Sequence, residues 1–540
     1  LKLDQAVIKG SEALEKLYEE KRQTLGEAKA EIFEAHRMIL QDEELIGHMR
    51  EHIRNNKWDA AYSAYQSSLF FAKMFEEMDN EYFRERAADI RDVGMRIVYD
   101  ILGLQRSSLG QMTEVSIIVA HDLSPYETAT LNTNLVKGFV TEIGGSTSHS
   151  AIIARTLGIP AIVGARGATR ELKHGEFVII DGHKGVVIKD PSEAEIQSYK
   201  DQYDRLQSEL KELQELATKP TCSLDGHRVH VATNLFMTET IVQALEAGVE
   251  GIGLFRSEFV YMNRVSAPSE QEQFAIYKKL AEGLHGKPVI IRTLDVGGDK
   301  HIDYLGIEHE DNPFLGYRAI RYCLNHESLF KTQLRAILKA SAFGNVLIMI
   351  PMISQVSEVR RARQILEVCK EELKAESIAF APNIQLGIMI EIPAAAVISD
   401  LLAKECDFFS IGTNDLVQYT LAVDRMNEKV ADIYSPFNPA VLRLVRMTIE
   451  NAHRNGIKVG MCGASASEPL LVPLYLGMGL DEFSVDVSAV LKTRKQINKL
   501  NYKECKGIVD QALSFATPDE IKAYMKVQLH ALVGSGGQPT

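Results

Sequence analysis

The feature that most constrains this fold is a regular alternation of strand-like and helix-like segments from residue 221 to near the end of the chain. Such alternation favours a parallel sheet wrapped by helices, because each parallel strand needs a crossover before the next one. Eight units in roughly 300 residues is the size of a (β/α)8 TIM barrel, which we therefore predict over residues 221–540. The strand candidates are 228–232, 251–255, 289–292, 346–350, 385–390, 408–411, 458–461 and 482–485.

The sequence before residue 191 has two different textures. Up to about residue 103 the pattern is helical, with Ile90, Val93 and Ile97 at spacings of three and four and almost no Gly or Pro. We predict an N-terminal helical bundle over 1–107. Short β-branched runs then alternate with Gly and Asp turns, which predicts a small α/β domain over 108–190. These runs are 115–119, 177–180 and 186–188.

A heptad-like stripe marks residues 191–220 as a connector. Its apolar residues are spaced alternately three and four, and Pro220 closes the segment. The pattern fits either a coiled coil or a single helix packed on a neighbouring domain, and both give a stiff linker helix. The stripe consists of Ile196, Tyr199, Tyr203, Leu206, Leu210 and Leu213.

Composition excludes several classes of protein. A chain of 540 residues exceeds what one hydrophobic core usually serves, so several domains are expected. No apolar run approaches the ~18 residues of a membrane span, and the net charge of −13 argues against broad nucleic-acid binding. The six cysteines are scattered without close pairs, which fits a reducing compartment. We expect a cytoplasmic protein whose acidic surface suits a basic protein partner.

The run Gly144-Gly-Ser-Thr-Ser-His149 resembles a glycine turn that feeds a short helix, with Gly158 and Pro160 ending it. His149 would lie in the first turn, where free N–H groups and the helix dipole favour a phosphate. The same field disfavours the imidazolium and keeps the ring nucleophilic. An isolated histidine is more often structural. The preceding glycines and hydroxyls favour a phosphohistidine here.

Two carboxylates follow predicted strands. Glu391 comes after the fifth strand and Asp415 after the sixth, so both should reach the mouth at which the C-terminal strand ends of a barrel converge. Mg²⁺ is commonly held by one or two carboxylates together with substrate phosphate oxygens. The alternative is that each residue caps a helix, which suits Asp415 better than Glu391. The arginines at the same mouth favour a metal pair.

Arg256, Arg292 and Arg425 could clamp a small dianion at this mouth, because guanidinium groups match both phosphate and carboxylate. Each of these arginines, taken alone, would be interpreted as a member of a surface ion pair. Asn414 directly precedes Asp415 and so follows the same predicted strand. Cys462 ends the seventh predicted strand, where a protonated thiol could give a proton to an enolate. On position alone, a buried apolar role for this cysteine is equally favoured.

Several segments together resemble enzyme I of the phosphoenolpyruvate:sugar phosphotransferase system, in order and over nearly the whole chain. They are Gly144-Gly-Ser-Thr-Ser-His149 with Gly158-Ile-Pro-Ala-Ile-Val-Gly164, Leu254-Phe-Arg-Ser-Glu-Phe259, residues 292–300, Asn312-Pro-Phe-Leu-Gly316, and residues 411–425. The resemblance implies a helical domain that docks the carrier protein HPr, a phosphohistidine domain, and a barrel that binds phosphoenolpyruvate and forms a homodimer. It implies transfer of the phosphoryl group from phosphoenolpyruvate to the enzyme and then to HPr, with release of pyruvate.

The resemblance also assigns roles to the candidate residues. His149 would accept the phosphoryl group, and Cys462 would protonate the enolate, which settles the open reading of that thiol. Arg256, Arg292, Asn414 and Arg425 would hold the substrate. Glu391 and Asp415 would bind Mg²⁺.

The chain departs from this family at three places. It begins in helical sequence at Leu1, where the family usually opens with a short strand and a glycine turn that join the phosphohistidine domain, so either residues are missing before Leu1 or that domain is compromised. Ser146 replaces a typical Arg, and Ala464-Ser-Ala-Ser-Glu468 replaces a more usual Glu-x-Ala-Gly-Asp. Three other functions share some features: a nucleotide-dependent dikinase or synthase, a stand-alone lyase, and a non-catalytic binder.

Overall fold

The computed structural model describes residues 1–25, 27–77, 81–104, 112–123, 127, 131, 132, 134–145, 151, 154, 158–262, 264–298, 300 and 302–533. The chain divides into two compact units, Leu1–Asp204 and Arg205–Thr540. The finer division into four segments stays a prediction. Among the described residues, no helix has both the length and the apolar character needed to cross a membrane.

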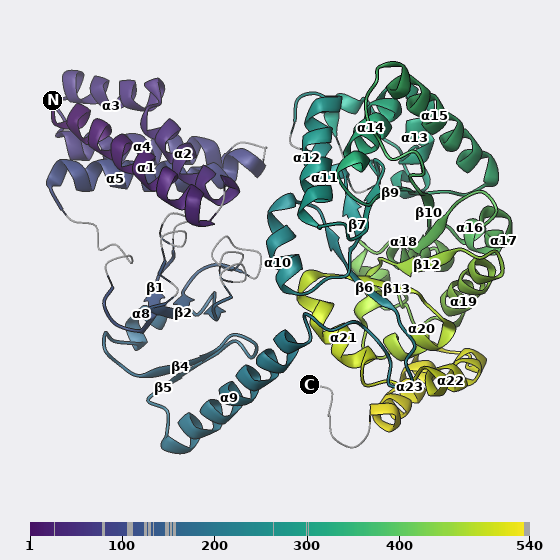
Figure 1. The fold of residues 1–540 in the computed structure, drawn as a ribbon. Helices are drawn as coiled ribbons and strands as arrows, with labels where there is room; N and C mark the ends of the chain where they lie inside the picture. The colour runs from purple at the N-terminus through teal and green to yellow at the C-terminus, as the bar shows by residue number, and fades with distance from the viewer. Residues whose placement is uncertain are drawn as a thin grey trace. The chain divides into compact units, whose positions relative to one another are not determined.

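The N-terminal segment is helical, as predicted, and is drawn in purple and blue in Figure 1. Ile90, Val93 and Ile97 are buried along one side of its last helix. Their spacing of three and four therefore marks the face that packs in the bundle. The helices are α1 (Lys2–Leu25), α2 (Glu27–Leu40), α3 (Glu43–Asn55), α4 (Ala60–Glu76) and α5 (Glu81–Leu102).

Small sheets follow the bundle. Among the described residues, a parallel sheet has the order β1-β2-β3, and β4 pairs with β5 in an antiparallel hairpin. The predicted strands coincide with β1, β4 and β5 to within one residue. The sequence did not identify β2, because Lys137 and Gly138 interrupt its apolar run. The elements are β1 (Ser116–Ala120), β2 (Val136–Thr141), β3 (Ala161–Ile162), α8 (Ala168–Glu171), β4 (Val178–Asp181) and β5 (Val186–Lys189).

The predicted linker helix is α9 (Glu193–Glu215). Beyond its C-terminal end, the backbone carbonyls of Leu216 and Ala217 accept hydrogen bonds from the buried guanidinium of Arg494 at 2.9 and 3.2 Å. Gly248 lies against the same turn, where a Cβ would come within 1.8 Å of the Ala217 carbonyl oxygen. Within the second unit, the turn after α9 is therefore held in place by a buried cation and by close backbone packing.

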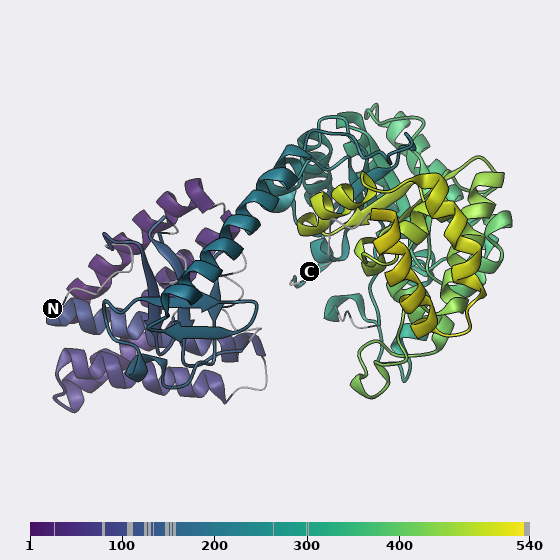
Figure 2. The same cartoon turned by 90° about the horizontal axis from the view of Figure 1, so that it is seen from below.

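Eight strands among the described residues close into a parallel barrel surrounded by helices (Figures 1 and 2), which confirms the predicted fold. Five strands have the predicted bounds, and β7 and β10 differ by one residue. The first strand, β6, was expected two residues earlier. The strands are β6 (His230–Leu235), β7 (Ile252–Arg256), β8 (Val289–Arg292), β9 (Val346–Ile350), β10 (Leu386–Ile390), β11 (Phe408–Ile411), β12 (Lys458–Met461) and β13 (Glu482–Val485).

Two apolar layers support the barrel. One lies between the strands and the outer helices, and a separate cluster that includes Leu254, Met349, Phe408 and Cys462 gathers alternate side chains of neighbouring strands. The helices are α10 (Ile241–Glu246), α11 (Glu258–Tyr261), α12 (Glu270–Gly283), α13 (Ile320–Asn325), α14 (Glu327–Ala340), α15 (Val356–Ala375), α16 (Pro393–Val397), α17 (Ser399–Leu402), α18 (Thr413–Leu421), α19 (Pro439–Arg454), α20 (Val472–Met478), α21 (Val490–Ile497), α22 (Tyr502–Ser514) and α23 (Pro518–Val533).

Candidate active site at the barrel mouth

The candidate residues of the barrel lie at the C-terminal ends of its strands. Arg256 ends β7 and Arg292 ends β8, and the two are paired in register across these neighbouring strands. Glu391 directly follows β10, and Asp415 lies in the first turn of α18 after β11. Cys462 directly follows β12. Because all strands are parallel, these side chains meet at one end of the barrel.

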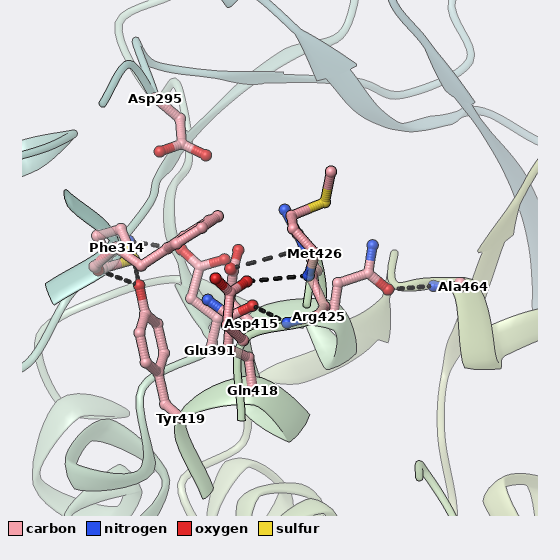
Figure 3. A network of polar contacts seen from close by, with 12 residues as sticks. Asp295, Phe314, Glu391, Asp415, Gln418, Tyr419, Arg425, Met426 and Ala464 are labelled. Atoms are coloured by element: carbon pink, nitrogen blue, oxygen red, sulfur yellow. Dashed lines mark hydrogen bonds and ion pairs between the residues drawn. The ribbon is translucent and has the colours of Figure 1, made fainter. Parts of the chain in front are cut away.

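A tight turn brings Arg425 back to the same place. Ala422 ends α18 in the left-handed conformation, and the backbone N–H of Arg425 donates to Gln418 Oε1 at 3.1 Å. The Arg425 guanidinium then lies 3.7 Å from Asp415 Oδ1. Figure 3 shows Arg425, Asp415 and Glu391 gathered around one space above the strand ends.

A buried ion-pair network lies behind these residues. Arg292 donates to Glu258 Oε1 at 2.7 Å, and its other terminal nitrogen lies 3.0 Å from Asp295 Oδ2. Lys300 adds a second cation to Glu258, at 2.6 Å. The side chains of Arg292, Glu258 and Asp295 are almost completely buried. The position of Arg292 is therefore set by two carboxylates, which leaves few alternative rotamers for it.

Arg318 extends this network to the carboxylate pair. It donates to Asp295 Oδ1 at 2.9 Å, and its other end lies 3.8 Å from Asp415 Oδ1. The approach of Arg318 requires glycine at residue 297, where a Cβ would lie 2.5 Å from Arg318 Cβ. The glycine pair at 297 and 298 thus has a packing reason that its sequence alone did not reveal.

The network keeps its members charged. Burial alone would lower the pKa of Arg292, but the carboxylates of Glu258 and Asp295 raise it above its ordinary value. Burial likewise opposes ionisation of Asp295, yet Arg318 and Arg292 hold its pKa well below the usual range. A buried charge is stable only with partners of opposite sign. The site is therefore a fixed array of charges at neutral pH.

Glu391 behaves differently, because burial and the neighbouring carboxylates outweigh the effect of Arg292 and Arg318 on its pKa. Burial and the nearby Asp415 raise the pKa of Glu391 to about 8. Glu391 Oε1 accepts a hydrogen bond from the Met352 N–H at 2.7 Å. Asp415 Oδ1 is buried and accepts no hydrogen bond from any described residue. Two buried carboxylates with spare oxygen lone pairs fit a hard divalent cation.

Strained backbone surrounds this pair. Ala319, Met352 and Ala422 have φ angles of 53, 58 and 53 degrees, in the left-handed region that residues other than glycine rarely adopt. Each is next to a site residue: Ala319 follows Arg318, Met352 binds Glu391, and Ala422 begins the turn to Arg425. Such conformations cost on the order of 1–3 kcal/mol each and need a rigid surrounding structure. The site is held in shape before any ligand arrives.

The loop after Cys462 contacts the carboxylate region through Asn414. Asn414 Oδ1 accepts a hydrogen bond from the Ala464 N–H at 3.0 Å. The Cys462 thiol is buried, and burial raises its pKa to about 11. The thiol therefore stays protonated at neutral pH. The unusual segment after Gly463 is a 3-10 turn (Ala464–Ser467) that packs against α18 through a Ser465–Thr413 hydroxyl contact of 3.0 Å.

His149 and Ser146 lie outside the described residues. The chain just before them is anchored by Glu142, whose carboxylate accepts from the His121 ring at 2.7 Å and from the Thr169 N–H at 3.0 Å. These hydrogen bonds lower the pKa of Glu142 to about 2. Gly144 follows in a left-handed conformation with φ 106 degrees.

Sequence reasoning missed Glu258, Asp295 and Arg318. Glu258 stands two residues after Arg256 and Asp295 three residues after Arg292, so both follow strands and could have been found by the rule that selected the arginines. Arg318 follows no strand. No local signal marks it.

Three family models match the chain. They are described as the PEP-utilising enzyme N-terminal domain (residues 1–86), mobile domain (residues 112–185) and PEP-binding domain (residues 210–502). The phosphoenolpyruvate-protein phosphotransferase of Bacillus subtilis (strain 168) is 47% identical over 97% of the chain and 92% of its own length. The protein of the same name from Geobacillus stearothermophilus is 48% identical over 97% and 91%. That of Staphylococcus aureus is 46% identical over 96% and 91%.

Proposed function

The chain belongs to the family of phosphoenolpyruvate-protein phosphotransferases, and on this premise we propose that it transfers the phosphoryl group of phosphoenolpyruvate to its own His149 and then to a histidine of the carrier HPr, releasing pyruvate. The observation that carries the proposal is the convergence of a carboxylate pair, arginines and a protonated thiol at one barrel mouth. His149 falls within the segment that matches the mobile domain.

Arg256, Arg292 and Arg425 are proposed to bind the phosphate and carboxylate of the substrate. Arg292 already has two carboxylate partners, so it offers the substrate a fixed rather than a mobile charge. Asn414 uses its side-chain oxygen on Ala464, which leaves the amide nitrogen as a donor for a substrate oxygen. Preformed donors of this kind neutralise the charge that moves during phosphoryl transfer.

Glu391 and Asp415 are proposed to hold Mg²⁺. The Asp415 oxygen that accepts no hydrogen bond from a described residue and the raised pKa of Glu391 are the observations that support a cation here. When bound, Mg²⁺ would neutralise charge on the substrate phosphate and orient it.

In the proposed reaction, each bond that forms is matched by a bond that breaks. A lone pair of the neutral His149 imidazole forms a bond to phosphorus, and the bond from phosphorus to the enol oxygen breaks. The electrons return through the enolate, whose terminal carbon takes the proton of the Cys462 thiol to give pyruvate. Solvent then reprotonates the thiolate. Phosphohistidine finally passes its phosphoryl group to HPr, which regenerates the neutral ring.

Two further features stay predictions. We propose that HPr docks on the N-terminal helical domain and that the protein forms a homodimer through the barrel. The expected cytoplasmic location follows from the role in sugar uptake that the proposal implies.

The test is incubation of the purified chain with ³²P-labelled phosphoenolpyruvate and Mg²⁺. We expect one acid-labile, base-stable phosphate per chain, its transfer to added HPr, and equimolar pyruvate. His149→Ala should abolish labelling, whereas His174→Ala, at an exposed histidine of the same region, should not. Transfer of the label to a nucleotide instead of HPr would indicate a dikinase or synthase. Pyruvate release without any label would indicate a lyase, and the absence of both a non-catalytic binder.

A further inference from the structure

Two histidines on α3 face each other with their outer ring nitrogens. His48 and His52 are one helical turn apart, and their Nε2 atoms are separated by 3.3 Å. Residues four apart on a helix share one face, so both rings can reach one atom between them. We propose that His48 and His52 form a binding site for a divalent transition-metal ion on the helical bundle.

The other nitrogen of each ring is already used. His48 Nδ1 lies 2.9 Å from Ser67 Oγ on α4, and His52 Nδ1 lies 2.8 Å from the side-chain amide of Asn56. Metal-binding histidines almost always have their second nitrogen hydrogen-bonded, because this bond fixes the tautomer and the ring orientation. Both rings of the pair meet this requirement, and both leave Nε2 for the ligand.

Aromatic side chains hold the two ring planes. Phe70 stacks on His48 with ring centroids 5.1 Å apart, and Trp58 stacks on His52 at 4.4 Å. The two imidazoles are nearly perpendicular, with an interplanar angle of 79 degrees. Neither ring can turn away without losing its stacking partner. The pair is therefore preorganised, which reduces the entropy lost when a ligand binds.

The hydrogen-bond partners of the two rings are compatible with a shared metal. Without a metal, His52 Nε2–H can donate to His48 Nε2 while His48 Nδ1–H donates to Ser67 Oγ and Asn56 donates to His52 Nδ1. With a metal on both Nε2 atoms, each Nδ1–H donates outward. Ser67 Oγ can accept such a bond, and so can the Asn56 amide oxygen once the amide is turned over.

The geometry suits metals that bind nitrogen. With metal–nitrogen bonds of about 2.0–2.1 Å, a nitrogen separation of 3.3 Å gives an angle of roughly 105 degrees at the metal, close to tetrahedral. Both histidines are partly exposed, so water can fill the remaining positions. Imidazole selects Cu²⁺, Ni²⁺ and Zn²⁺, with Cu²⁺ the tightest, whereas Mg²⁺ prefers oxygen. This site is chemically distinct from the carboxylate pair of the barrel.

The chain contains its own reporter for this site. Trp58 is its single tryptophan, and it stacks directly on His52. A paramagnetic Cu²⁺ ion held by this ring should quench the Trp58 fluorescence.

The experiment titrates the untagged full chain with CuSO₄, NiCl₂ and MgCl₂ while Trp58 emission is followed. We expect saturable quenching at one Cu²⁺ per chain, weaker Ni²⁺ binding, and no response to Mg²⁺. His48→Gln and His52→Gln should each weaken Cu²⁺ binding at least tenfold. His174→Gln, at an exposed histidine elsewhere, should leave the titration unchanged. Electron paramagnetic resonance of the Cu²⁺ complex should show two coupled imidazole nitrogens.

Equal quenching of wild type and the double variant would overturn the proposal, as would a resonance spectrum without imidazole coupling. Thermal unfolding and the Trp58 emission maximum of metal-free variants test whether the bundle is still folded. Ser67→Ala keeps both ligands and removes one orienting bond, so it should weaken Cu²⁺ binding less than either histidine variant. A Ser67→Ala effect larger than that of His48→Gln would also contradict the site.

Discussion

The side-chain oxygen of Asn414 accepts a hydrogen bond from the backbone N–H of Ala464 at 3.0 Å, which joins the first turn of α18 to the segment after β12. The first turn of α18 also carries Asp415, and the segment after β12 begins with Cys462. A substitution at Asn414 therefore acts on two proposed functions, substrate binding by the amide nitrogen and placement of the thiol by the oxygen.

Asn414→Asp should separate these two functions. The carboxylate keeps an acceptor for Ala464 but replaces the amide donor with a negative charge facing the substrate. A lost hydrogen bond to a charged group is worth about 1.5–3 kcal/mol, so we expect kcat/KM for phosphoenolpyruvate to fall roughly 10- to 100-fold. The measurement is initial-rate pyruvate formation. Asn414→Ala should in addition lower the single-turnover rate of pyruvate release, and equal effects of the two variants would show that the Ala464 contact has no role.

Arg292→Ala should destabilise the barrel. It leaves Glu258 and Asp295 buried with fewer cations, and breaking a buried pair by removing one partner costs about 3–5 kcal/mol. Denaturant unfolding followed by barrel-specific hydrogen exchange measures the loss. Arg446→Ala is the matched control, since Arg446 pairs with Glu450 and Asp510 on the exposed outer surface and should cost less than about 1 kcal/mol.

Cys462 should keep its proton over an unusually wide pH range. Burial raises the thiol pKa from near 9 to about 11 in the folded chain, so its ionisation begins to cost stability only as the pH rises from 9 through 11. Alkylation of Cys462 by iodoacetamide, followed by peptide mass spectrometry, should still be accelerating above pH 9.5. A rate that levels off near pH 8.5 would mean an ordinary thiol. Cys462→Ala should slow pyruvate release about 10²- to 10⁴-fold.

Arg494→Ala should loosen the junction after α9. The substitution leaves the partly buried carbonyls of Leu216, Ala217 and Gly248 without their donor, which should cost about 2 kcal/mol. Amide exchange in residues 212–221 should become faster. Lys495→Ala alters the next residue, whose exposed pair with Glu212 should contribute little, and it provides the control.

Much of the fold could be predicted because the strands of a parallel barrel are short apolar runs. Such runs can be recognised in the sequence without knowing which strands they pair with. The β8, β9 and β11 strands are such runs, ended by Thr293, Pro351 and Gly412, and their predicted bounds were correct. The first strand was shifted because Thr233 and Asn234 look like a strand end. Both lie inside β6, where Thr233 Oγ1 donates to the Val485 carbonyl at 2.8 Å. A polar residue bonded to a neighbouring strand gives no local strand signal.

Site residues that directly follow a strand could be predicted from the sequence. Site residues that the tertiary fold brings in from elsewhere in the chain could not. Arg256, Arg292, Glu391 and Asp415 share one rule of position, and the structure places all of them at one barrel end. Arg318 reaches Asp295 from a segment without a strand. Its position depends on how the chain turns between Gly297 and Ala319, which no spacing rule describes.

The left-handed residues Ala319, Met352 and Ala422 have an evolutionary consequence. Glycine at any of them would relax the backbone, yet it would also enlarge the set of shapes open to the loops beside the carboxylate pair. Variants selected only for heat resistance should therefore accumulate changes elsewhere. Replacement of these three residues by glycine during evolution would indicate a descendant protein that no longer catalyses the reaction.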